Sequence, residues 1–428
     1  MSGRILQGPK LHSCIEKTIF VEEPSISLIE ESLKDVPHKP EIIVFEESQK
    51  YSSLSDMMKT HPSEEEFRPV QTNIHETAIM LLTSGTSGQS KVVCHSHYSI
   101  LRMLDVLNQC GHRAKSVLHL NIFQWLSALM AFTLTFLEGG TRVFCHKMDG
   151  EFFLKIIEKY KPTALYLPPN YSYDLTRIQD AKKYDVSSLN CIATGSTPLS
   201  IKQFRRMDDL FGNATILFGY GMTELGRIAS FNLETDKHLI KSKTASCGKI
   251  VPGTGVKVVN PDTNEILGPN QKGEIWVKSP STMRGYFKRE DSDCFDDDGF
   301  LRTEDVGYYD EDECFYVVGR ITQMIKYQSS YIQPYSIEAV LMEHPAVTDA
   351  AVFGIPQGEE QVPAACIVLN SDVSAQEIET FVEERVSDAE KLRGGIAFVA
   401  SLPKTPSGKN ITMEVKDMFQ KYLFNFTC

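Results

Sequence analysis

The stretch Thr83-Ser84-Gly85-Thr86-Ser87-Gly88-Gln89-Ser90-Lys91 directly follows an apolar run at residues 78–82, which indicates a strand. The two glycines allow a close turn in which backbone amides converge on phosphate oxygens. The hydroxyl side chains add donors, and Lys91 adds a positive charge. This is not a Walker A loop, because no Gly-Lys-Ser/Thr sequence closes it. The pattern predicts a phosphate-binding loop, and composition alone leaves a flexible polar loop as the alternative.

A second glycine-rich segment, Phe218-Gly219-Tyr220-Gly221-Met222-Thr223-Glu224, follows another strand-like run. The glycines on both sides of Tyr220 expose its ring, and a flat aromatic face suits a purine base. The hydroxyl of Thr223 and the carboxylate of Glu224 can bind a phosphate oxygen and a Mg²⁺ ion. A strand-end turn carrying a surface acid is the alternative for this segment taken alone.

Two further segments are weaker signals. Residues 299–305 end in Thr303-Glu304-Asp305, where a lone Asp would normally be a turn residue. Residues 402–409 form a Pro/Gly-rich loop that ends in Lys409, and such loops usually lie in solvent. Neither segment identifies a function by itself.

The order and spacing of these segments resemble the adenylate-forming superfamily, which includes acyl-CoA synthetases, beetle luciferases and peptide-synthetase adenylation domains. Within it the chain most resembles insect luciferase-like and 4-coumarate-type CoA ligases. The resemblance extends from about residue 15 to 422 and is carried by residues 83–91, 194–199, 219–224, 273–277 with 283–287, 303–305, 318–320 and 403–409.

The resemblance implies that the chain binds ATP, Mg²⁺, CoA and a small carboxylic acid, a fatty or aryl acid. The acid would become an acyl-adenylate with loss of pyrophosphate, and the acyl group would then pass to CoA with release of AMP. The implied catalytic residues are Thr223 at the α-phosphate, Glu224 as the Mg²⁺ ligand, and Lys409 between the acyl carboxylate and the α-phosphate.

The same resemblance implies the residues that bind ATP and CoA. The β- and γ-phosphates would lie on Thr83, Ser84, Gly85, Thr86, Ser87, Gly88 and Lys91, and adenine between Tyr220 and the segment Gly195, Ser196 and Thr197. Asp305 would accept hydrogen bonds from the ribose hydroxyls, with Arg320 in support. Lys326 completes the implied set of binding residues.

The chain also departs from the family pattern. Ser90 replaces the proline of the phosphate loop, Glu304 replaces a glycine beside the ribose site, and Ser329 replaces a glycine on the path of the CoA thiol. Residues 123–126 replace a histidine-rich motif near the acyl pocket. These departures support an alternative, a catalytically silent relative that binds a nucleotide or an acyl group. An oxygen-using luciferase-type enzyme is a third alternative, which depends on pocket details that are not seen here.

The alternation of strand-like and helical patterns predicts an α/β fold. We expect a large domain at residues 1–319, made of parallel α/β subdomains and a small antiparallel β unit, and a small mobile α+β lid domain at residues 320–428. Family members carry a longer leading stretch before the phosphate loop. The large domain is therefore expected to be N-terminally shortened and to expose apolar surface.

Composition narrows the partners. Lys and Arg number 44 against 56 Asp and Glu, a net charge of −12, which argues against nucleic acid and anionic membranes. Ten scattered cysteines fit a reducing compartment. The apolar run at residues 125–137 is too short to cross a bilayer and indicates a buried helix. No signal peptide or C-terminal Ser-Lys-Leu address is seen. We therefore expect an intracellular protein, in the cytosol ahead of the peroxisome; the sequence carries no signal for an oligomeric state.

Overall fold

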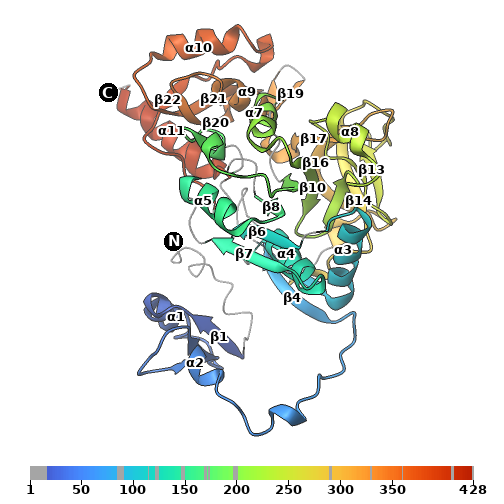
Figure 1. Ribbon diagram of the computed structural model, residues 1–428. Helices are drawn as coiled ribbons and strands as arrows, with labels where there is room; N and C mark the ends of the chain where they lie inside the picture. Colours follow the sequence, from blue (N-terminus) through green and yellow to red (C-terminus); the bar gives the residue numbers. More distant parts are fainter. Residues whose placement is uncertain are drawn as a thin grey trace. The chain divides into compact units, whose positions relative to one another are not determined.

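The computed structural model describes residues 17–83, 91–113, 115–120, 125–145, 150–167, 171, 174–195, 201–288, 292–327, 330–358, 360–405 and 409–426. The chain divides into two compact units, Met1–Asn73 and Ile74–Cys428 (Figure 1). The boundary expected between residues 319 and 320 falls inside the second unit and remains a prediction.

The first unit is a small parallel sheet with short helices. Its core is formed by apolar side chains of β1, β2 and α1, among them Val21, Ile29 and Val44, which are all buried. Its strands pair in the order β1–β2–β3. The elements are β1 (Thr18–Val21), α1 (Ile26–Ser32), β2 (Glu41–Val44), β3 (Ser52–Ser53) and α2 (Leu54–Met57), with short 3-10 turns at Glu23–Ser25 and Glu64–Glu66.

A seven-stranded sheet forms the body of the second unit, in the order β12-β11-β10-β9-β8-β6-β7. Strands β7, β6, β8, β9 and β10 are parallel, whereas β11 and β12 run antiparallel at one edge. The strands are β6 (Ser116–Leu120), β7 (Thr141–Cys145), β8 (Ala164–Tyr166), β9 (Cys191–Gly195), β10 (Thr215–Met222), β11 (Gly226–Ser230) and β12 (Lys249–Ile250).

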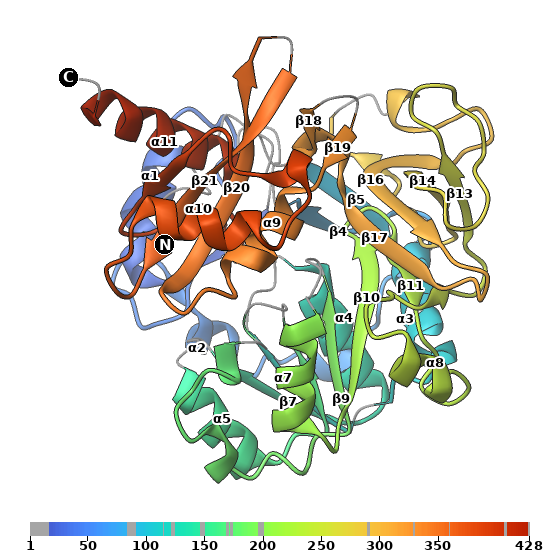
Figure 2. The same cartoon turned by 90° about the horizontal axis from the view of Figure 1, so that it is seen from above.

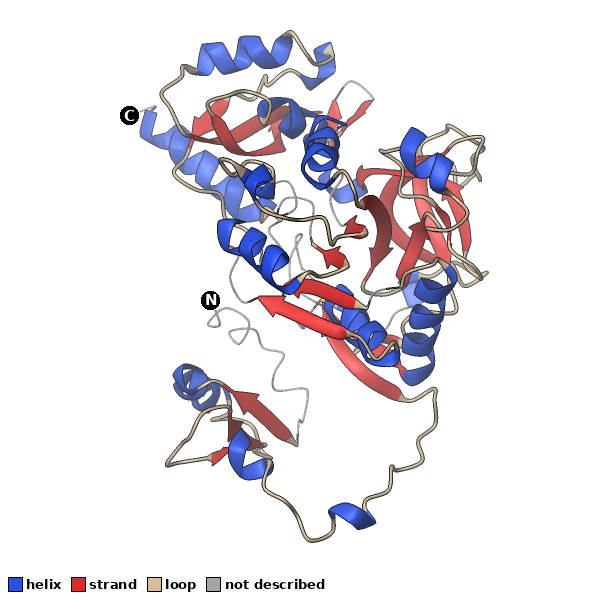
Figure 3. Ribbon diagram, in the orientation of Figure 1, coloured by secondary structure: helices blue, strands red, loops and turns tan. Residues whose placement is uncertain are grey.

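Helices cover this sheet (Figure 3). One face packs against α5 and α7 through a cluster that includes Phe153, Ile157 and Phe211. The other face includes Tyr166, Cys191 and Leu217 and packs against residues of α4 and α8. The helices are α3 (His97–Gln109), α4 (Leu126–Leu137), α5 (Gly150–Tyr160), α7 (Ile201–Phe211) and α8 (Lys237–Ser242), with a 3-10 turn at Ala181–Lys183.

Helix α4 corrects one expectation. The apolar run at residues 125–137 is helical, but the interpretation that the helix is buried is wrong for part of its surface. Phe132, Phe136 and Leu137 are 43%, 77% and 64% exposed, and Phe144 of the neighbouring β7 is 52% exposed. The second unit thus carries exposed apolar side chains along α4 and β7.

Two antiparallel sheets complete the large part of the second unit. One has the order β13-β14-β16-β17 and the other β15-β5-β4. Their strands are β4 (Thr77–Leu82), β5 (Val92–Ser96), β13 (Gly255–Val259), β14 (Gly273–Lys278), β15 (Gly285–Tyr286), β16 (Leu301–Tyr309) and β17 (Phe315–Arg320), with a 3-10 turn at Ser292–Cys294. The expected small antiparallel β unit is confirmed.

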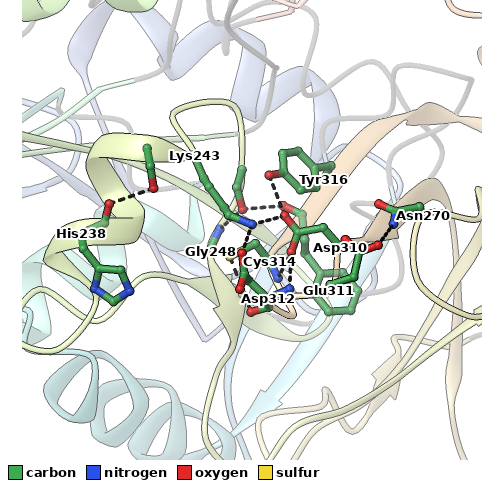
Figure 4. A network of polar contacts seen from close by, with 12 residues as sticks. His238, Lys243, Gly248, Asn270, Asp310, Glu311, Asp312, Cys314 and Tyr316 are labelled. Atoms are coloured by element: carbon green, nitrogen blue, oxygen red, sulfur yellow. Dashed lines mark hydrogen bonds and ion pairs between the residues drawn. The ribbon is translucent and has the colours of Figure 1, made fainter.

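A polar network ties helix α8 to the β16–β17 turn (Figure 4). Lys243, at the end of α8, forms ion pairs with Asp310, at 2.6 Å, and with Asp312. The hydroxyl of Tyr316 donates to the same Asp310 carboxylate at 3.0 Å. Because Asp310 receives both groups, it joins the helix to the small sheet.

The C-terminal part is an α+β layer in which α9, α10 and α11 gather around β20 and β21 (Figure 2). Strands β20, β21 and β22 form one sheet, and β18 and β19 form a hairpin. Ser374 caps α10 by accepting from the Glu377 amide at 3.1 Å. The elements are β18 (Ile325–Tyr327), β19 (Ser330–Ile332), α9 (Pro334–Leu341), β20 (Val347–Gln357), β21 (Glu360–Leu369), α10 (Ala375–Glu383), β22 (Ile396–Phe398) and α11 (Thr412–Phe426), with 3-10 turns at Ile321–Gln323 and Asp388–Glu390.

The overall prediction of fold is confirmed: the structure is α/β, with parallel sheet, a small antiparallel β unit and a C-terminal α+β part. In the ranges that the structure describes, no helix combines the length and apolarity needed to cross a bilayer.

Glu304 lies in a strained backbone position within β16. Its φ is +60°, a left-handed conformation that favours glycine. The pairing of β14 with β16 is irregular at this point: Glu274 pairs with Val306 and Trp276 with Arg302. The extra residues of β16 form a bulge, and the exposed Glu304 stands at its tip. The left-handed backbone therefore explains why the family pattern has a glycine at this position.

His112 is buried at the end of helix α3. Gly111, with φ +76°, ends the helix, and the amide of His112 donates to the Leu107 carbonyl at 3.0 Å. The imidazole is 2% exposed. Burial, with a smaller effect of the positive charge of Arg227, lowers the pKa of His112 to about 3. The imidazole is therefore neutral in the folded chain.

Replacing Glu304 by glycine is expected to stabilise the protein by about 1 kcal/mol, because the left-handed backbone costs glycine little. Urea unfolding of wild type and Glu304→Gly measures the difference. Glu265→Gly is the matched control, since Glu265 is exposed and lies outside the set of positive-φ residues. That control is expected to be destabilised, and a Glu304→Gly variant destabilised to the same extent would contradict the strain.

Acidification is expected to destabilise the fold partly through His112. The folded state holds this imidazole neutral, with a pKa of about 3, whereas the unfolded chain protonates it near the ordinary value of 6.5. The stabilising contribution is complete above the unfolded value and is lost as the pH falls toward the folded one. Between pH 7 and pH 5 it should fall by about 2 kcal/mol. Urea unfolding at both pH values measures the loss of unfolding free energy between pH 7 and pH 5, which should be smaller for His112→Gln than for the wild type. An equal loss in the two proteins would contradict the assignment to His112.

Candidate functional site

The predicted phosphate loop closes an antiparallel hairpin of β4 and β5. The Thr83 amide donates to the Lys91 carbonyl at 2.9 Å, and the Lys91 amide donates to the Thr83 hydroxyl at 2.9 Å. Leu82 and Val92 pair directly beneath them. The two ends of the loop are thus held together by backbone pairing. Five of the predicted loop residues lie outside the described residues: Ser84, Gly85, Thr86, Ser87 and Gly88.

Lys91 and Glu224 meet through Tyr286. The Lys91 ammonium lies 4.7 Å from the centre of the Tyr286 ring, and the Tyr286 hydroxyl donates to Glu224 Oε1 at 2.8 Å. Glu224 is 7% exposed, and its carbonyl accepts from the Met283 amide at 2.7 Å. Segments far apart in the sequence therefore bring a cation, a phenol and a carboxylate together.

His95 holds the turn that carries Thr223 and Glu224. It follows the phosphate loop on β5 and is completely buried. Its Nε2 lies 2.7 Å from the Thr223 carbonyl, which can only accept, so Nε2 is the protonated nitrogen. Burial lowers the pKa of His95, although the bond to Thr223 opposes this. A neutral imidazole thus fixes the turn to the strand that leaves the loop.

A second cluster centres on Asp305. The Tyr220 hydroxyl donates to Asp305 Oδ2 at 2.8 Å, and Arg320 Nε donates to Oδ1 at 2.9 Å. Asp305 and Arg320 are direct partners across β16 and β17. The Asp305 amide donates to the Thr303 hydroxyl at 3.1 Å. Burial, with the Asp305 charge, raises the pKa of Tyr220, so the phenol keeps its proton. Tyr220 is only 7% exposed, so the expectation that its flanking glycines expose the ring is wrong.

Lys409 belongs electrostatically to this second cluster. Burial lowers the pKa of Lys409, the positive charge of Arg320 lowers it further, and the negative charge of Asp305 raises it. Its backbone is held by Thr405, whose amide donates to the Lys409 carbonyl at 2.8 Å. Lys404 is bound elsewhere, in an ion pair of 2.6 Å with Asp349. Lys409 is thus the lysine of this loop whose charge meets the Asp305 cluster.

Gly195 and Lys326 complete the described part of the predicted set. Gly195, at the end of β9, pairs with Gly219 of β10, and a Cβ on Gly195 would lie 2.5 Å from the Gly219 carbonyl oxygen. Only glycine allows this approach. Lys326 lies exposed on β18, with its ammonium 5.9 Å from the ring centre of Tyr331. Ser196 and Thr197 lie outside the described residues.

The donor set suits a Mg²⁺ ion that is shared with a phosphate. Across the described ranges, no group of three or more His, Cys, Asp or Glu side chains could hold a metal by itself. Mg²⁺ is usually bound through one or two carboxylates together with water and substrate phosphates. Glu224, a lone carboxylate next to the end of the loop that carries Lys91, fits that mode of binding.

Two contributors were missed from the sequence. Tyr286 lies in the 283–287 segment, which matched the family pattern without indicating a role. His95 carries no local signal, because its partner Thr223 is 128 residues away. Long-range pairing of this kind becomes visible only in the folded chain.

Comparison with family models identifies both parts of the chain. Residues 11–287 match the model described as AMP-binding enzyme. Residues 336–409 match the model described as AMP-binding enzyme C-terminal domain. The first match alone covers more than half of the chain.

Individual relatives agree with the family models. A peroxisomal OPC-8:0-CoA ligase of Arabidopsis thaliana is 35% identical over 368 residues, which cover 83% of this chain and 66% of that protein. A luciferin 4-monooxygenase of Nipponoluciola cruciata is 36% identical over 295 residues, 68% of this chain and 53% of that protein. The chain thus spans between about half and just under two-thirds of these relatives.

A solved structure extends the likeness to the fold. The luciferase-like enzyme from the nonluminescent mealworm Zophobas morio has a TM-score of 0.69 and 47% sequence identity, and the match covers 73% of each chain. The motifs, the fold and these matches agree, and the chain belongs to the AMP-binding enzyme family, whose members include CoA ligases and luciferases.

Proposed function

We propose that the chain activates a carboxylic acid, a fatty or aryl acid, with ATP and passes the acyl group to CoA. One observation carries the proposal: residues 220–224, at the end of β10, connect two clusters. Tyr220 joins Asp305, Arg320 and Lys409 at one end. Glu224 joins Lys91 through Tyr286 at the other. A triphosphate with its nucleoside needs this combination of cations, donors and an aromatic ring.

The first step forms the acyl-adenylate. A carboxylate oxygen attacks the α-phosphorus, the bond from phosphorus to the bridging oxygen breaks, and pyrophosphate leaves with the electron pair. The protein contributes positioning and charge stabilisation more than covalent chemistry. Lys91, with Thr83 and the loop at residues 84–88, would hold the β- and γ-phosphates. Thr223 would contact the α-phosphate.

The nucleoside would lie over Tyr220, with adenine between its ring and residues 195–197. Asp305 would accept from the ribose hydroxyls, and Arg320 would hold the Asp305 carboxylate in place. That carboxylate already accepts from Tyr220 and Arg320, and a carboxylate has further lone pairs for a hydroxyl donor. Glu224 would hold Mg²⁺, which neutralises phosphate charge when it is bound.

Lys409 would stabilise the charge that develops between the carboxylate and the α-phosphate. Its environment supports this role, because Arg320 lies within electrostatic range and burial disfavours an isolated ammonium. A triphosphate would supply the missing negative charge. The lysine would then be most stable as a cation when the substrate is bound.

In the second step the CoA thiolate attacks the acyl carbonyl carbon and AMP leaves as the mixed anhydride bond breaks. We propose that residues 320–428 form a mobile lid relative to residues 1–319, because one scaffold must serve two half-reactions. Lys326 would help to bind CoA. Small molecules would be the partners, since a net charge of −12 disfavours nucleic acid.

The proposed place of action is the reducing interior of the cell, with the cytosol ahead of the peroxisome. Its support is that the eight cysteines in the described ranges are all free. Free thiols like these are typical of such compartments.

Replacing Lys409 by alanine is expected to lower ATP–pyrophosphate exchange by a factor of about 100 or more, since one lost transition-state contact commonly has that effect. The wild type is first assayed across a panel of fatty and aryl acids to find one that supports exchange. ATP affinity, measured by calorimetry, should change little in Lys409→Ala.

The matched control is Lys421→Ala, which removes an exposed lysine of α11 and should exchange like the wild type. Wild-type exchange in Lys409→Ala would overturn the role of Lys409. A wild type that binds ATP but gives no exchange with any acid would instead favour the catalytically silent relative.

A further inference from the structure

Arg227 places a guanidinium against bare backbone of β10. Arg227 lies on β11, where its backbone pairs with Gly221 of β10. A Cβ built on Gly219 would lie 1.7 Å from Arg227 Nη1 and 2.9 Å from Cζ, so the guanidinium fills the space of the missing side chain. Successive side chains of a strand point to opposite faces. The guanidinium therefore lies on the face of β10 away from the Tyr220 ring and its Asp305 partner.

The Arg227 side chain forms no hydrogen bond and no ion pair with any of the described residues, so its positive charge has no counter-ion among them. The groups that feel its charge include His112, Tyr166, Cys191 and Cys247. Burial keeps these groups neutral, because it lowers the pKa of His112 to about 3 and raises the pKa of the Cys191 and Cys247 thiols to about 12. Asp236 acts on Cys110 and Asp305 acts on Cys247, two thiols that also feel the charge of Arg227, but neither carboxylate forms an ion pair with it. A partly buried cation without a direct counter-ion is costly unless an anion joins it.

His112 supplies an independent observation at the same place. Its Nδ1 lies 3.2 Å from the Tyr166 hydroxyl. Its Nε2 is buried and has no hydrogen-bond partner in the described part of the chain. A buried polar nitrogen left unpaired destabilises the folded chain. The partly buried guanidinium and the buried imidazole, which feels its charge, are thus two polar groups that a ligand would satisfy.

The position along β10 gives the length of that ligand. Gly219, beside the guanidinium, precedes Thr223 by four residues. Because β10 ends at Met222 and Thr223 lies in the turn that follows, a rise of about 3.3 Å per residue sets an upper limit of about 13 Å on their separation. An extended carbon chain of up to about ten atoms covers this distance.

We propose that Arg227, with His112, determines substrate specificity and selects an acid that carries a second carboxylate at its far end. This inference rests on the proposed acid activation at Thr223, Glu224 and Lys409. The reacting carboxylate would lie at the α-phosphate while the distant carboxylate pairs with the guanidinium. The substrate class is a medium-chain α,ω-dicarboxylic acid.

The test compares dicarboxylates of roughly six to twelve carbons with monocarboxylates of equal length in ATP–pyrophosphate exchange. The wild type should favour the dicarboxylates in kcat/KM by about tenfold or more, as expected for a charge-assisted contact. Arg227→Met should reverse the preference, and Arg227→Lys should keep part of it. Arg205→Met, which removes an exposed arginine of α7, should match the wild type.

A second measurement does not depend on catalysis. Decanedioate and decanoate are titrated calorimetrically into ATP-loaded wild type and Arg227→Met. Tighter binding of decanedioate than of decanoate by the wild type, with the preference lost in Arg227→Met, supports the inference. This holds even if no acid supports exchange, because the absence of exchange would overturn only the proposed function. Equal or tighter binding of decanoate by the wild type overturns the inference, as does a preference for acids with a neutral far-end hydroxyl.

Discussion

The carboxylate of Asp305 joins the parts of the structure on which the candidate site depends. It accepts the Tyr220 hydroxyl from the large sheet and the Arg320 guanidinium from the neighbouring strand of the small sheet, at 2.8 and 2.9 Å. Charge-assisted bonds of this kind are stronger than neutral ones. Arg320 also ends β17 and precedes the C-terminal part. The Asp305 carboxylate therefore lies where the seven-stranded sheet, the β13-β14-β16-β17 sheet and the start of the C-terminal part meet.

Strand β10 separates two environments. On one face, Tyr220 reaches Asp305, and Lys409 lies within range of the same charges. On the other, Gly219 has no side chain and Arg227 occupies its place. A nucleotide on the first face and an acid along the second would meet at Thr223 and Glu224, where the strand ends. The glycines around Tyr220 thus allow close approach at the backbone of β10, whereas the Tyr220 side chain itself is buried.

Local chemistry explains what could be predicted from the sequence. The hydroxyl-rich loop, the glycine-flanked Tyr220 and the strand–helix alternation are short-range patterns, and they gave the α/β fold and the family. The roles assigned to individual residues remain predictions. The strain at Glu304 could not be predicted from the sequence, because its φ of +60° arises in a bulge that forms only when β14 and β16 pair. The exposed face of α4 was missed because a helix without charged residues has no charged side to reveal its orientation.

Long-range pairs were beyond the reach of sequence patterns. His95 meets Thr223 across 128 residues, and Tyr286 meets Glu224 across 62. Arg227 follows the Thr223–Glu224 segment closely, yet its significance comes from groups such as His112 and Cys191 that folding brings near its charge.

ATP affinity of an Asp305→Asn variant tests the central claim most directly, because the claim is that this carboxylate organises a nucleotide site. Asparagine keeps the size of the side chain but removes its charge and one of its acceptor oxygens. Calorimetric titration should show ATP binding weakened by about tenfold or more relative to the wild type, with the fold retained by circular dichroism. Unchanged ATP affinity in a folded Asp305→Asn protein would contradict the account.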